Sequence, residues 1–400
     1  MLMLAASDLH IGRIPALPGN LDGVTGRSAW EAVVRCALSR KVEVVLLAGD
    51  VVEGVSAQFE AYGPLKKGLA QLREAGIQVL AVAGNHDARV FPQLAGDSGA
   101  VRILGLGGVW EAFELGPIRI LGWSFPETQY RNNPMDRFDE AALAGGRPYL
   151  GLLHCDLDGA AGSPYAPVPS RSLERTGAAS WVLGHIHKGE PRAGDRAFYC
   201  GSAFALDAGE EGEHGAWLLE ISDHGTLRSR ERIALSPWRF TTLEVDLEAV
   251  ETFDAAMARA VAAMEGAAAI DPGGSLFCSL RLRGACGLSG VLARQFEERL
   301  PELDLTGAGG TVRPTGRVID ATTPLLPVAE LAQGRGIRGI LARVIQQTAE
   351  ADRPMAELPD LLAKVAALLP AGSSPEQARQ TLATAARRLL QTVEAQRKAL

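Results

Sequence analysis

The stretch that decides the fold is IQVLAVAGNHD, residues 77–87. Its first seven residues are mostly apolar, which is the length and composition of a buried β-strand. The run stops at Gly84, and Asn85, His86 and Asp87 follow at once. Few structural needs place an amide, an imidazole and a carboxylate together in one turn. The segment therefore predicts a strand that ends in a chemically active loop.

The same arrangement recurs elsewhere in the N-terminal half of the chain. Five of the seven histidines fall in such motifs, whereas His214 and His224 do not, and we predict no catalytic role for these two. Ligand sites in α/β sheets lie beyond the carboxyl ends of the strands, so loops from several strands can converge on one crevice. The other motifs, each after a short apolar run, are Asp8-Leu9-His10, Gly49-Asp50, His154 and Gly184-His185-Ile186-His187.

The residue types in these motifs suit two divalent cations. Carboxylates, imidazoles and one carboxamide are ligands for Mn²⁺, Fe²⁺ or Zn²⁺, and the lack of thiolates in the motifs argues against a structural zinc site. Two neighbouring cations would supply a nucleophilic water and neutralise a phosphate during in-line attack. Each motif alone has a simpler explanation, such as a turn or a surface histidine, but the ordered set does not. The residues therefore predict two metals and a phosphate substrate.

Strand and helix patterns predict how the chain is divided. Residues 1–236 alternate short apolar runs with amphipathic helices, which predicts an α/β (α+β) layered sandwich. Within this part, a helix over residues 56–74 is expected to be interrupted at Gly63-Pro64. Residues 237–322 predict a small α+β cap domain. Residues 328–400 predict short amphipathic helices, whose apolar stripes could face the body of the chain, a second copy or a partner.

Composition describes an ordinary globular protein without a bulk positive charge. The net charge is −7, with 47% hydrophobic and 22% charged residues, so DNA contact would need local basic patches. The five cysteines have no CxxC spacing and predict reduced thiols. No apolar run reaches the length of a membrane span, and the N-terminus lacks the basic leader of a signal peptide. We therefore expect a cytoplasmic protein that does not bind membranes.

The motifs resemble those of the calcineurin-like metallophosphoesterases, and within them the SbcD/YhaO branch of Mre-type DNA repair exonucleases. The likeness is carried by residues 7–12, 83–87, 183–188, 199–202 and 214–217. It implies a four-layer α/β/β/α metallophosphoesterase sandwich with a small α+β cap domain and a helical C-terminal region. It also implies a DNA exonuclease or endonuclease that uses two divalent ions, chiefly Mn²⁺, with Mg²⁺, Fe²⁺ and Zn²⁺ as other options. The resemblance implies two partners. One is a second copy of the chain, in a homodimer formed by helices near residues 56–75. The other is an SMC-like ATPase bound through the C-terminal helices.

The resemblance implies roles for single residues as well. His86 is the expected catalytic residue, which assists the leaving oxygen without binding metal. Asp87 is expected to orient a neighbouring histidine. The sequence departs from the family at Val51-Val52-Glu53, where an aromatic residue and an aspartate are common. The expected ligands are Asp8, His10, Asp50 and His187 for one metal, and Asp50, Asn85, His154 and His185 for the other, with Asp50 bridging the two.

Two alternative functions remain open. The chain could be another phosphoesterase, acting on cyclic nucleotides or phosphoproteins, although small-molecule enzymes of this kind rarely need a cap and a helical tail. It could also be a DNA-end-binding scaffold subunit for an SMC-like ATPase, although a scaffold has no need for Asp50 and Asn85 together. The basic pairs Arg387-Arg388 and Arg397-Lys398 fit a solvated helix face as well as a DNA contact.

Overall fold

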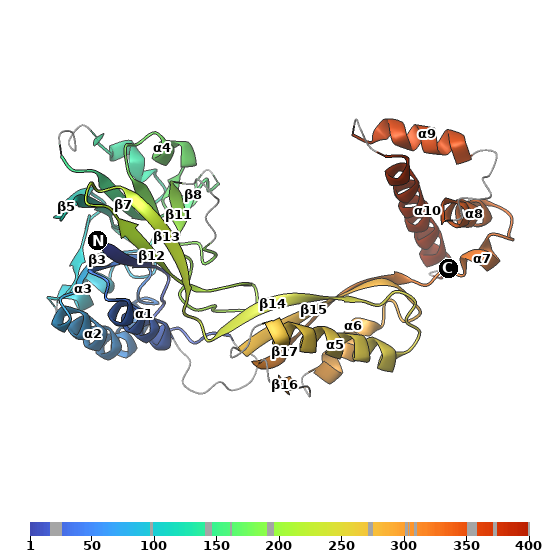
Figure 1. The fold of residues 1–400 in the computed structure, drawn as a ribbon, viewed down its shortest axis with the longest axis horizontal. Coiled ribbons are helices and arrows are strands. Elements are labelled where there is room, and N and C mark those ends of the chain that lie inside the picture. Colours follow the sequence, from blue (N-terminus) through green and yellow to red (C-terminus); the bar gives the residue numbers. More distant parts are fainter. Residues whose placement is uncertain are drawn as a thin grey trace. The chain divides into compact units, whose positions relative to one another are not determined.

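The computed structural model forms two compact units. The first comprises Met1–Thr242, Glu265–Ser279 and Leu303–Thr315, and the second comprises Leu243–Met264, Leu280–Glu302 and Gly316–Leu400. Figure 1 shows the elements of each unit in sequence colours. The structure describes residues 1–16, 26–96, 99–140, 146–160, 162–189, 196–270, 275–300, 303, 305–307, 310–349, 358–370 and 374–398.

A six-stranded sheet in the order β13-β12-β1-β2-β3-β4 carries the first three predicted motifs. Its centre is parallel, because β1 pairs with β2 and β2 pairs with β3 in the same direction. Parallel strands covered on both faces are apolar throughout, which explains why these runs lack polar alternation. The strands are β1 (Leu2–Ala6), β2 (Val44–Ala48), β3 (Gln78–Val82), β4 (Arg102–Ile103), β12 (Gly215–Ile221) and β13 (Leu227–Ala234).

A five-stranded sheet in the order β11-β10-β7-β6-β5 carries the other two motifs. Strands β6, β7, β10 and β11 run parallel, and β5 joins the edge through an antiparallel hairpin. The strands are β5 (Glu111–Leu115), β6 (Ile118–Trp123), β7 (Tyr149–His154), β10 (Ser180–Gly184) and β11 (Ala197–Tyr199). A separate pair, β8 (Asp156–Leu157) and β9 (Pro167–Val168), follows β7.

The two sheets pack face to face, and helices and loops cover their outer faces. Side chains such as Leu46 and Leu152 form one buried cluster between the sheets. Helices α1 (Gly26–Arg40), α2 (Gln58–Glu74) and α3 (Phe91–Gly96) supply the cluster on the outer face of the first sheet. The outer face of the second sheet packs on loops, the turn η2 (Pro134–Arg137) and the short helix α4 (Ser170–Glu174). The predicted four-layer α/β/β/α sandwich is confirmed.

Helix α2 follows the short turn η1 (Val55–Ala57), and it is not interrupted as the sequence suggested. Pro64 lies inside the continuous helix, so the expected break at Gly63-Pro64 is wrong. Proline removes only one helical donor, and the carbonyl of Glu60 that loses this donor belongs to an exposed residue. The carbonyl of Pro64 also accepts a hydrogen bond from Nε1 of Trp30 at 3.0 Å, which fixes α2 against α1.

The region after residue 236 contains the α+β elements that the sequence predicts. A four-stranded sheet has the order β14-β15-β17-β16. Its last strand in sequence ends at Pro324, two residues beyond the predicted boundary at residue 322. The elements are β14 (Trp238–Asp246), α5 (Phe253–Ile270), β15 (Ser275–Cys286), α6 (Leu292–Arg299), β16 (Leu305–Gly307) and β17 (Gly310–Pro324).

The C-terminal helices pack on one another. Their shared core includes Ala342, Ile345, Leu382 and Leu390. Apolar residues of the predicted stripes therefore face one another. Among the described residues, no helix is long and apolar enough to cross a membrane. The helices are α7 (Val328–Leu331), α8 (Ile337–Ala349), α9 (Leu358–Leu368) and α10 (Pro375–Lys398).

Candidate metal centre

The predicted site residues lie at or just after the carboxyl ends of β1, β2, β3, β7 and β10, three strands of one sheet and two of the other. Four of them have a left-handed backbone, with φ of 50° at Asp8, 47° at His10, 50° at Asp50 and 104° at His185. Residues other than glycine rarely adopt this conformation, and such strain is concentrated at functional sites. The loops are therefore held in place by the fold for a purpose other than stability.

The glycines of two motifs allow the loops to approach closely. A Cβ atom on Gly84 would lie 2.2 Å from Oδ1 of Asp50. A Cβ atom on Gly184 would lie 2.0 Å from the carbonyl oxygen of Ala48. Both distances are far below van der Waals contact, so only glycine fits at these two positions. The Gly-Asn-His-Asp and Gly-His-Ile-His motifs need their glycines for this reason.

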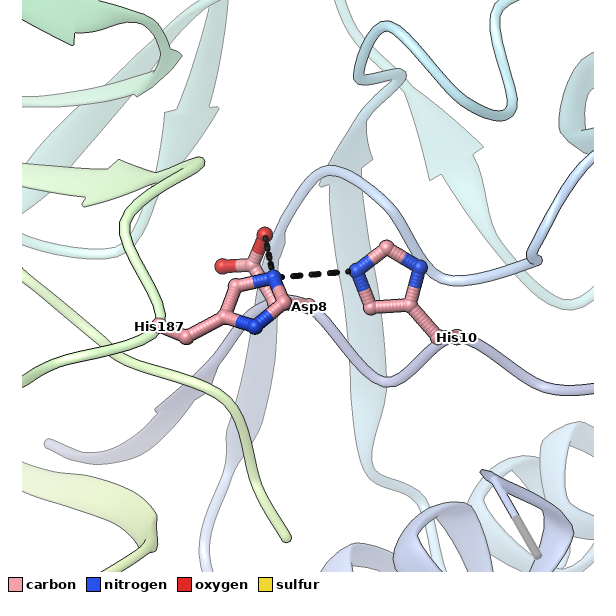
Figure 2. Close-up of side chains that lie close together, drawn as sticks. All are labelled: Asp8, His10 and His187. Atoms are coloured by element: carbon pink, nitrogen blue, oxygen red, sulfur yellow. Dashed lines mark hydrogen bonds and ion pairs between the residues drawn. The ribbon is translucent and has the colours of Figure 1, made fainter. Parts of the chain in front are cut away.

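One group of donor atoms is formed by Asp8, His10 and His187 (Figure 2). Nε2 of His10 lies 3.2 Å from Nε2 of His187, and Nε2 of His187 lies 3.9 Å from Oδ1 of Asp8. Asp8 and His10 come from the loop after β1 and His187 from the loop after β10, and their ligand atoms all lie within 4.8 Å of one another. The first predicted metal position is thus assembled as a compact set of nitrogen and oxygen atoms.

A carboxylate lies within ion-pair distance of the other nitrogen of each imidazole, and that of Glu210 also accepts a hydrogen bond from His187. Nδ1 of His10 lies 2.6 Å from Oε2 of Glu53, and Nδ1 of His187 lies 2.5 Å from Oε1 of Glu210. A neutral imidazole has one proton, and a carboxylate partner keeps that proton on Nδ1. The two Nε2 lone pairs then face each other and Asp8, which is unfavourable unless a cation lies among them. Carboxylate–histidine–metal arrangements have this pattern, so the residues fit a metal ion.

The second group of donor atoms contains Asp50, His154 and Asn85. Nδ1 of His154 lies 2.9 Å from the carbonyl oxygen of Ala48, so this nitrogen donates. Nε2 of His154 then presents a lone pair 3.3 Å from Oδ2 of Asp50 and 3.1 Å from Oδ1 of Asn85. Three acceptors thus meet in a place where His154 is fully buried. A proton or a metal cation must lie among them, and the donor types suit a divalent metal.

The pKa shifts of these groups also show that a positive charge is stabilised beside the carboxylates. Burial disfavours the charged form of His154, but the carboxylates of Asp50 and Asp8 overcome it and raise the pKa of His154 to about 9. Burial also acts to raise the pKa of Asp50, but the imidazoles of His154, His10 and His86 hold it well below its usual range. In contrast, burial and then the charge of His154 lower the pKa of His185 to about 4. Asp50 is therefore ionised and His185 neutral, as metal ligands must be.

His185 and His86 lie at the edges of these groups. The backbone N–H of His185 donates to both carboxylate oxygens of Asp8, each at 3.2 Å. Its ring lies 5.4 Å from the ring of His154, centroid to centroid. The backbone N–H of His86 donates to Oδ1 of Asp50 at 2.9 Å, and one ring nitrogen lies within 4.8 Å of the donor atoms of His10 and Asp50. His86 is the most exposed of the set, with 39% of its side chain accessible, as a group that meets substrate would be.

Asp87 has a different role from the one expected. Its carboxylate accepts from the backbone N–H of Gly84 and of Val51, each at 2.7 Å, and from Val52 at 3.3 Å. Burial, followed by the charge of Asp50, raises the pKa of Asp87 to about 7. Among the described residues its hydrogen bonds go to backbone amides and not to a histidine. Asp87 thus ties the loop after β3 to the loop after β2.

The structure brings all the predicted site residues to one place, and it adds two carboxylates that the sequence did not single out. Glu53 stands next to the Gly49-Asp50 motif, where it is notable only as a departure from the family pattern. Glu210 is distant from every motif in sequence, and only its position between residues 199–202 and 214–217 could have drawn attention to it.

Comparisons with known proteins agree with this site. Residues 1–189 match the family of calcineurin-like phosphoesterases, and residues 240–311 match the middle domain of the metallophosphoesterase YhaO. The chain is 26% identical over 256 residues to an uncharacterized metallophosphoesterase, YhaO of Bacillus subtilis, covering 56% of this chain and 58% of that protein. It is 25% identical over 276 residues to a subunit of the nuclease SbcCD of Rhodobacter capsulatus, covering 56% of this chain and 67% of that protein.

Solved structures match the chain at lower sequence identity. A dimetal phosphatase from Danio rerio aligns with 58% of this chain and 96% of its own, at 13% identity and a TM-score of 0.38. The chain matches little more than half of YhaO along its length. The two family matches are consecutive in sequence. Residues 1–189 are thus similar to calcineurin-like phosphoesterases, and residues 240–311 are similar to the YhaO middle domain.

Proposed function

We propose that the chain is a two-metal DNA nuclease, an exonuclease or endonuclease of DNA repair that uses Mn²⁺. The proposal rests on the two groups of metal-ligand atoms described above, each of which is unfavourable without a cation. One is Asp8, His10 and His187, and the other is Asp50, His154 and Asn85. Two divalent cations bound there would supply a nucleophile at neutral pH and neutralise the charge of a phosphate.

The residues of the chain divide the remaining tasks. Nδ1 of His86 lies 3.3 Å from the backbone carbonyl oxygen of Glu53, which can hold a proton on that nitrogen. Nε2 of His86 is then left to serve the leaving oxygen of a phosphodiester as an acid or a charge stabiliser. Asp87 keeps the loops that carry Asp50 and Asn85 together through its backbone hydrogen bonds. Binding, orientation and leaving-group assistance thus come from separate side chains.

DNA as the substrate is supported by similarity rather than by the metal ligands. Phosphate chemistry follows from the donor groups, which would serve any phosphoester. The similarity to a nuclease component in Rhodobacter capsulatus, at 25% identity, favours a nucleic-acid phosphodiester. A second domain after the phosphoesterase domain, which small-molecule enzymes rarely need, favours it as well. We therefore place DNA first and small phosphodiesters second.

The test compares substrates at equal metal concentration. Wild-type protein with Mn²⁺ is given end-labelled linear duplex DNA, circular single-stranded DNA, bis(p-nitrophenyl) phosphate and a cyclic nucleotide. We expect DNA cleavage that His86→Ala reduces on the order of 10²- to 10⁴-fold. His224→Ala, which alters an exposed histidine outside the site, serves as the matched control and should retain full activity.

Other results would select another function. Hydrolysis of the small phosphodiester or cyclic nucleotide without DNA cleavage would refute the nuclease proposal and favour the alternative phosphoesterase. DNA binding without any hydrolysis would favour a DNA-end-binding scaffold. An Asp50→Ala protein that supports repair as well as wild type would favour the scaffold too, because no chemistry would then depend on the bridging carboxylate.

We also propose a homodimer and an SMC-like ATPase as partners. Phe59 of α2 is 85% exposed and Val55 before it is 57% exposed, which favours a helix face that a second copy covers. Leu368 and Leu389 of the C-terminal helices are 86% and 57% exposed, which favours an apolar partner surface. Light scattering should detect a dimer that Phe59→Glu converts to a monomer. A pull-down of the ATPase should fail with Leu389→Glu, and unchanged capture would exclude this surface.

A further inference from the structure

The loop from Ser202 to His214 links the candidate metal centre to a second set of hydrogen bonds. Glu210, in this loop, accepts from Nδ1 of His187 through Oε1 at 2.5 Å. Its other oxygen, Oε2, accepts from the backbone N–H of Leu206 at 2.9 Å and lies 3.2 Å from Oγ of Ser202. Both oxygens are therefore committed, and the carboxylate has one orientation in which all its partners are satisfied.

The two ends of the loop are bound to each other. Nδ1 of His214 lies 2.8 Å from Oγ of Ser202, and Nε2 of His214 lies 3.1 Å from the backbone carbonyl oxygen of Glu210. His214 is buried, and the hydrogen bonds of its ring go to this loop and not to the predicted metal ligands. Its imidazole closes the loop around Glu210, which gives a structural reason for a histidine that the metal chemistry does not use.

The outer side of the loop rests on the first residues of β14. Nε1 of Trp238 donates to the carbonyl oxygen of Ala205 at 3.1 Å, and its ring lies 5.0 Å from that of Phe204. The backbone N–H of Gly212 donates to the carbonyl oxygen of Phe240 at 3.0 Å. Packing on the one side and His187 on the other leave Glu210 little freedom to move.

We propose that Glu210, held by Ser202 and His214, is a positioning residue for one of the two metal positions. It keeps the proton of His187 on Nδ1 and so presents Nε2 to the metal that Asp8 and His10 also bind. The inference rests on the proposed dimetal centre and deepens it. It also makes the centre asymmetric, because His154 is oriented by the carbonyl of Ala48 instead of a carboxylate.

Replacement of the carboxylate by an amide should act at one metal only. In Glu210→Gln, the amide can accept from His187 or from Leu206, but it must turn an N–H₂ group toward the other. If that group faces His187, the imidazole proton moves to Nε2, where it excludes the metal. Loss of an orienting partner of this type weakens metal binding on the order of 10- to 100-fold. The position with His154 should keep its affinity.

The experiment titrates the full-length, metal-free chain with Mn²⁺ by calorimetry and with Co²⁺ by visible absorption. Wild type should bind two ions. Glu210→Gln should bind one as tightly as wild type and the other on the order of 10- to 100-fold more weakly, with a changed Co²⁺ spectrum. Glu213→Gln, an exposed carboxylate of the same loop, is the matched control and should behave as wild type. Ser202→Ala should weaken the same ion to a smaller degree.

The outcomes separate this inference from the proposed function. Two ions bound equally well by wild type and Glu210→Gln would overturn the inference and leave the dimetal centre intact. Equal weakening of both ions would overturn it too, because the loop would then support the whole site. Fewer than two ions in wild type would overturn the dimetal centre itself. If Glu210→Gln does not fold, Ser202→Ala decides, and wild-type binding by that variant would refute the proposed support.

Discussion

Gly84→Ala is the substitution for which the structure gives the clearest result. The new Cβ would lie 2.2 Å from Oδ1 of Asp50 and 2.7 Å from the backbone nitrogen of Asp50. The carboxylate cannot turn away freely, since Oδ1 accepts from the backbone N–H of His86 at 2.9 Å. The backbone cannot move freely, because Asp50 has a left-handed φ of 50° directly after a buried strand. The loop after β2 or the loop after β3 must therefore shift.

The cost has two parts. Inserting one methyl group into a packed site typically destabilises a protein by about 1–3 kcal/mol. Loss of a hydrogen bond to a charged group adds about 1.5–3 kcal/mol. We expect a loss of roughly 2.5–6 kcal/mol in the free energy of unfolding, a large fraction of the ~5–15 kcal/mol typical of a domain. Because Asp50 is the expected bridging ligand, both metal ions should bind more weakly.

Urea unfolding of the metal-free protein measures the first effect, and Mn²⁺ titration measures the second. Gly266→Ala is the matched control, because a Cβ there meets no atom within 4 Å beyond its chain neighbours and the residue lies in α5. Alanine in place of glycine inside a helix should stabilise by about 0.5–1 kcal/mol. A Gly84→Ala protein with wild-type stability and two tightly bound ions would refute the close packing of these loops.

Three further results are expected. Since the pKa of His154 is raised to about 9, a metal must displace its proton below that pH. Affinity for one ion should therefore rise ~10-fold per pH unit and level off above about pH 9, with proton release seen by calorimetry in different buffers; a flat profile would contradict the ligand role. Chelation should lower the melting temperature, because a metal at 100 times its Kd stabilises by about 2.7 kcal/mol; an unchanged melting curve would argue against bound metal. Glu53→Gln should leave folding intact but reduce the metal affinity of the His10 position, and unchanged titrations would exclude that contact.

The sequence predicted the strands and most of the site because both depend on local patterns. The apolar run of residues 77–83 and the Gly-Asn-His-Asp turn after it lie within eleven consecutive residues. Strand type, strand end and polar loop can all be read from such a segment. The failed break at Gly63-Pro64 shows the limit of local rules. Pro64 stays inside α2, and its carbonyl accepts from the side chain of Trp30 in α1, a contact that local rules do not include.

The orienting groups could not be predicted, because they depend on contacts between distant segments. Glu210 is 23 residues from His187 in sequence and binds it only because the loop returns to the metal centre. Glutamates are frequent on any protein surface, so neither Glu53 nor Glu210 has a distinctive local signature. Asp87 stands within a recognisable motif, but its partners are backbone amides. Nearly every residue has such an amide, so the sequence does not indicate which ones Asp87 binds.

The different supports of the two metal positions have a chemical consequence. His10 and His187 each have a carboxylate on the other nitrogen, which makes their Nε2 atoms stronger donors. His154 has a neutral carbonyl partner, and Asn85 would be a neutral ligand, so the residues around the second position would supply less negative charge. The more weakly held ion would then lie on the side of Asn85. A substrate phosphate can complete the coordination of an ion more readily where the protein holds it less firmly. We therefore expect substrate to raise metal affinity mainly at the position of His154, and calorimetry with a non-hydrolysable phosphodiester analogue can measure that change.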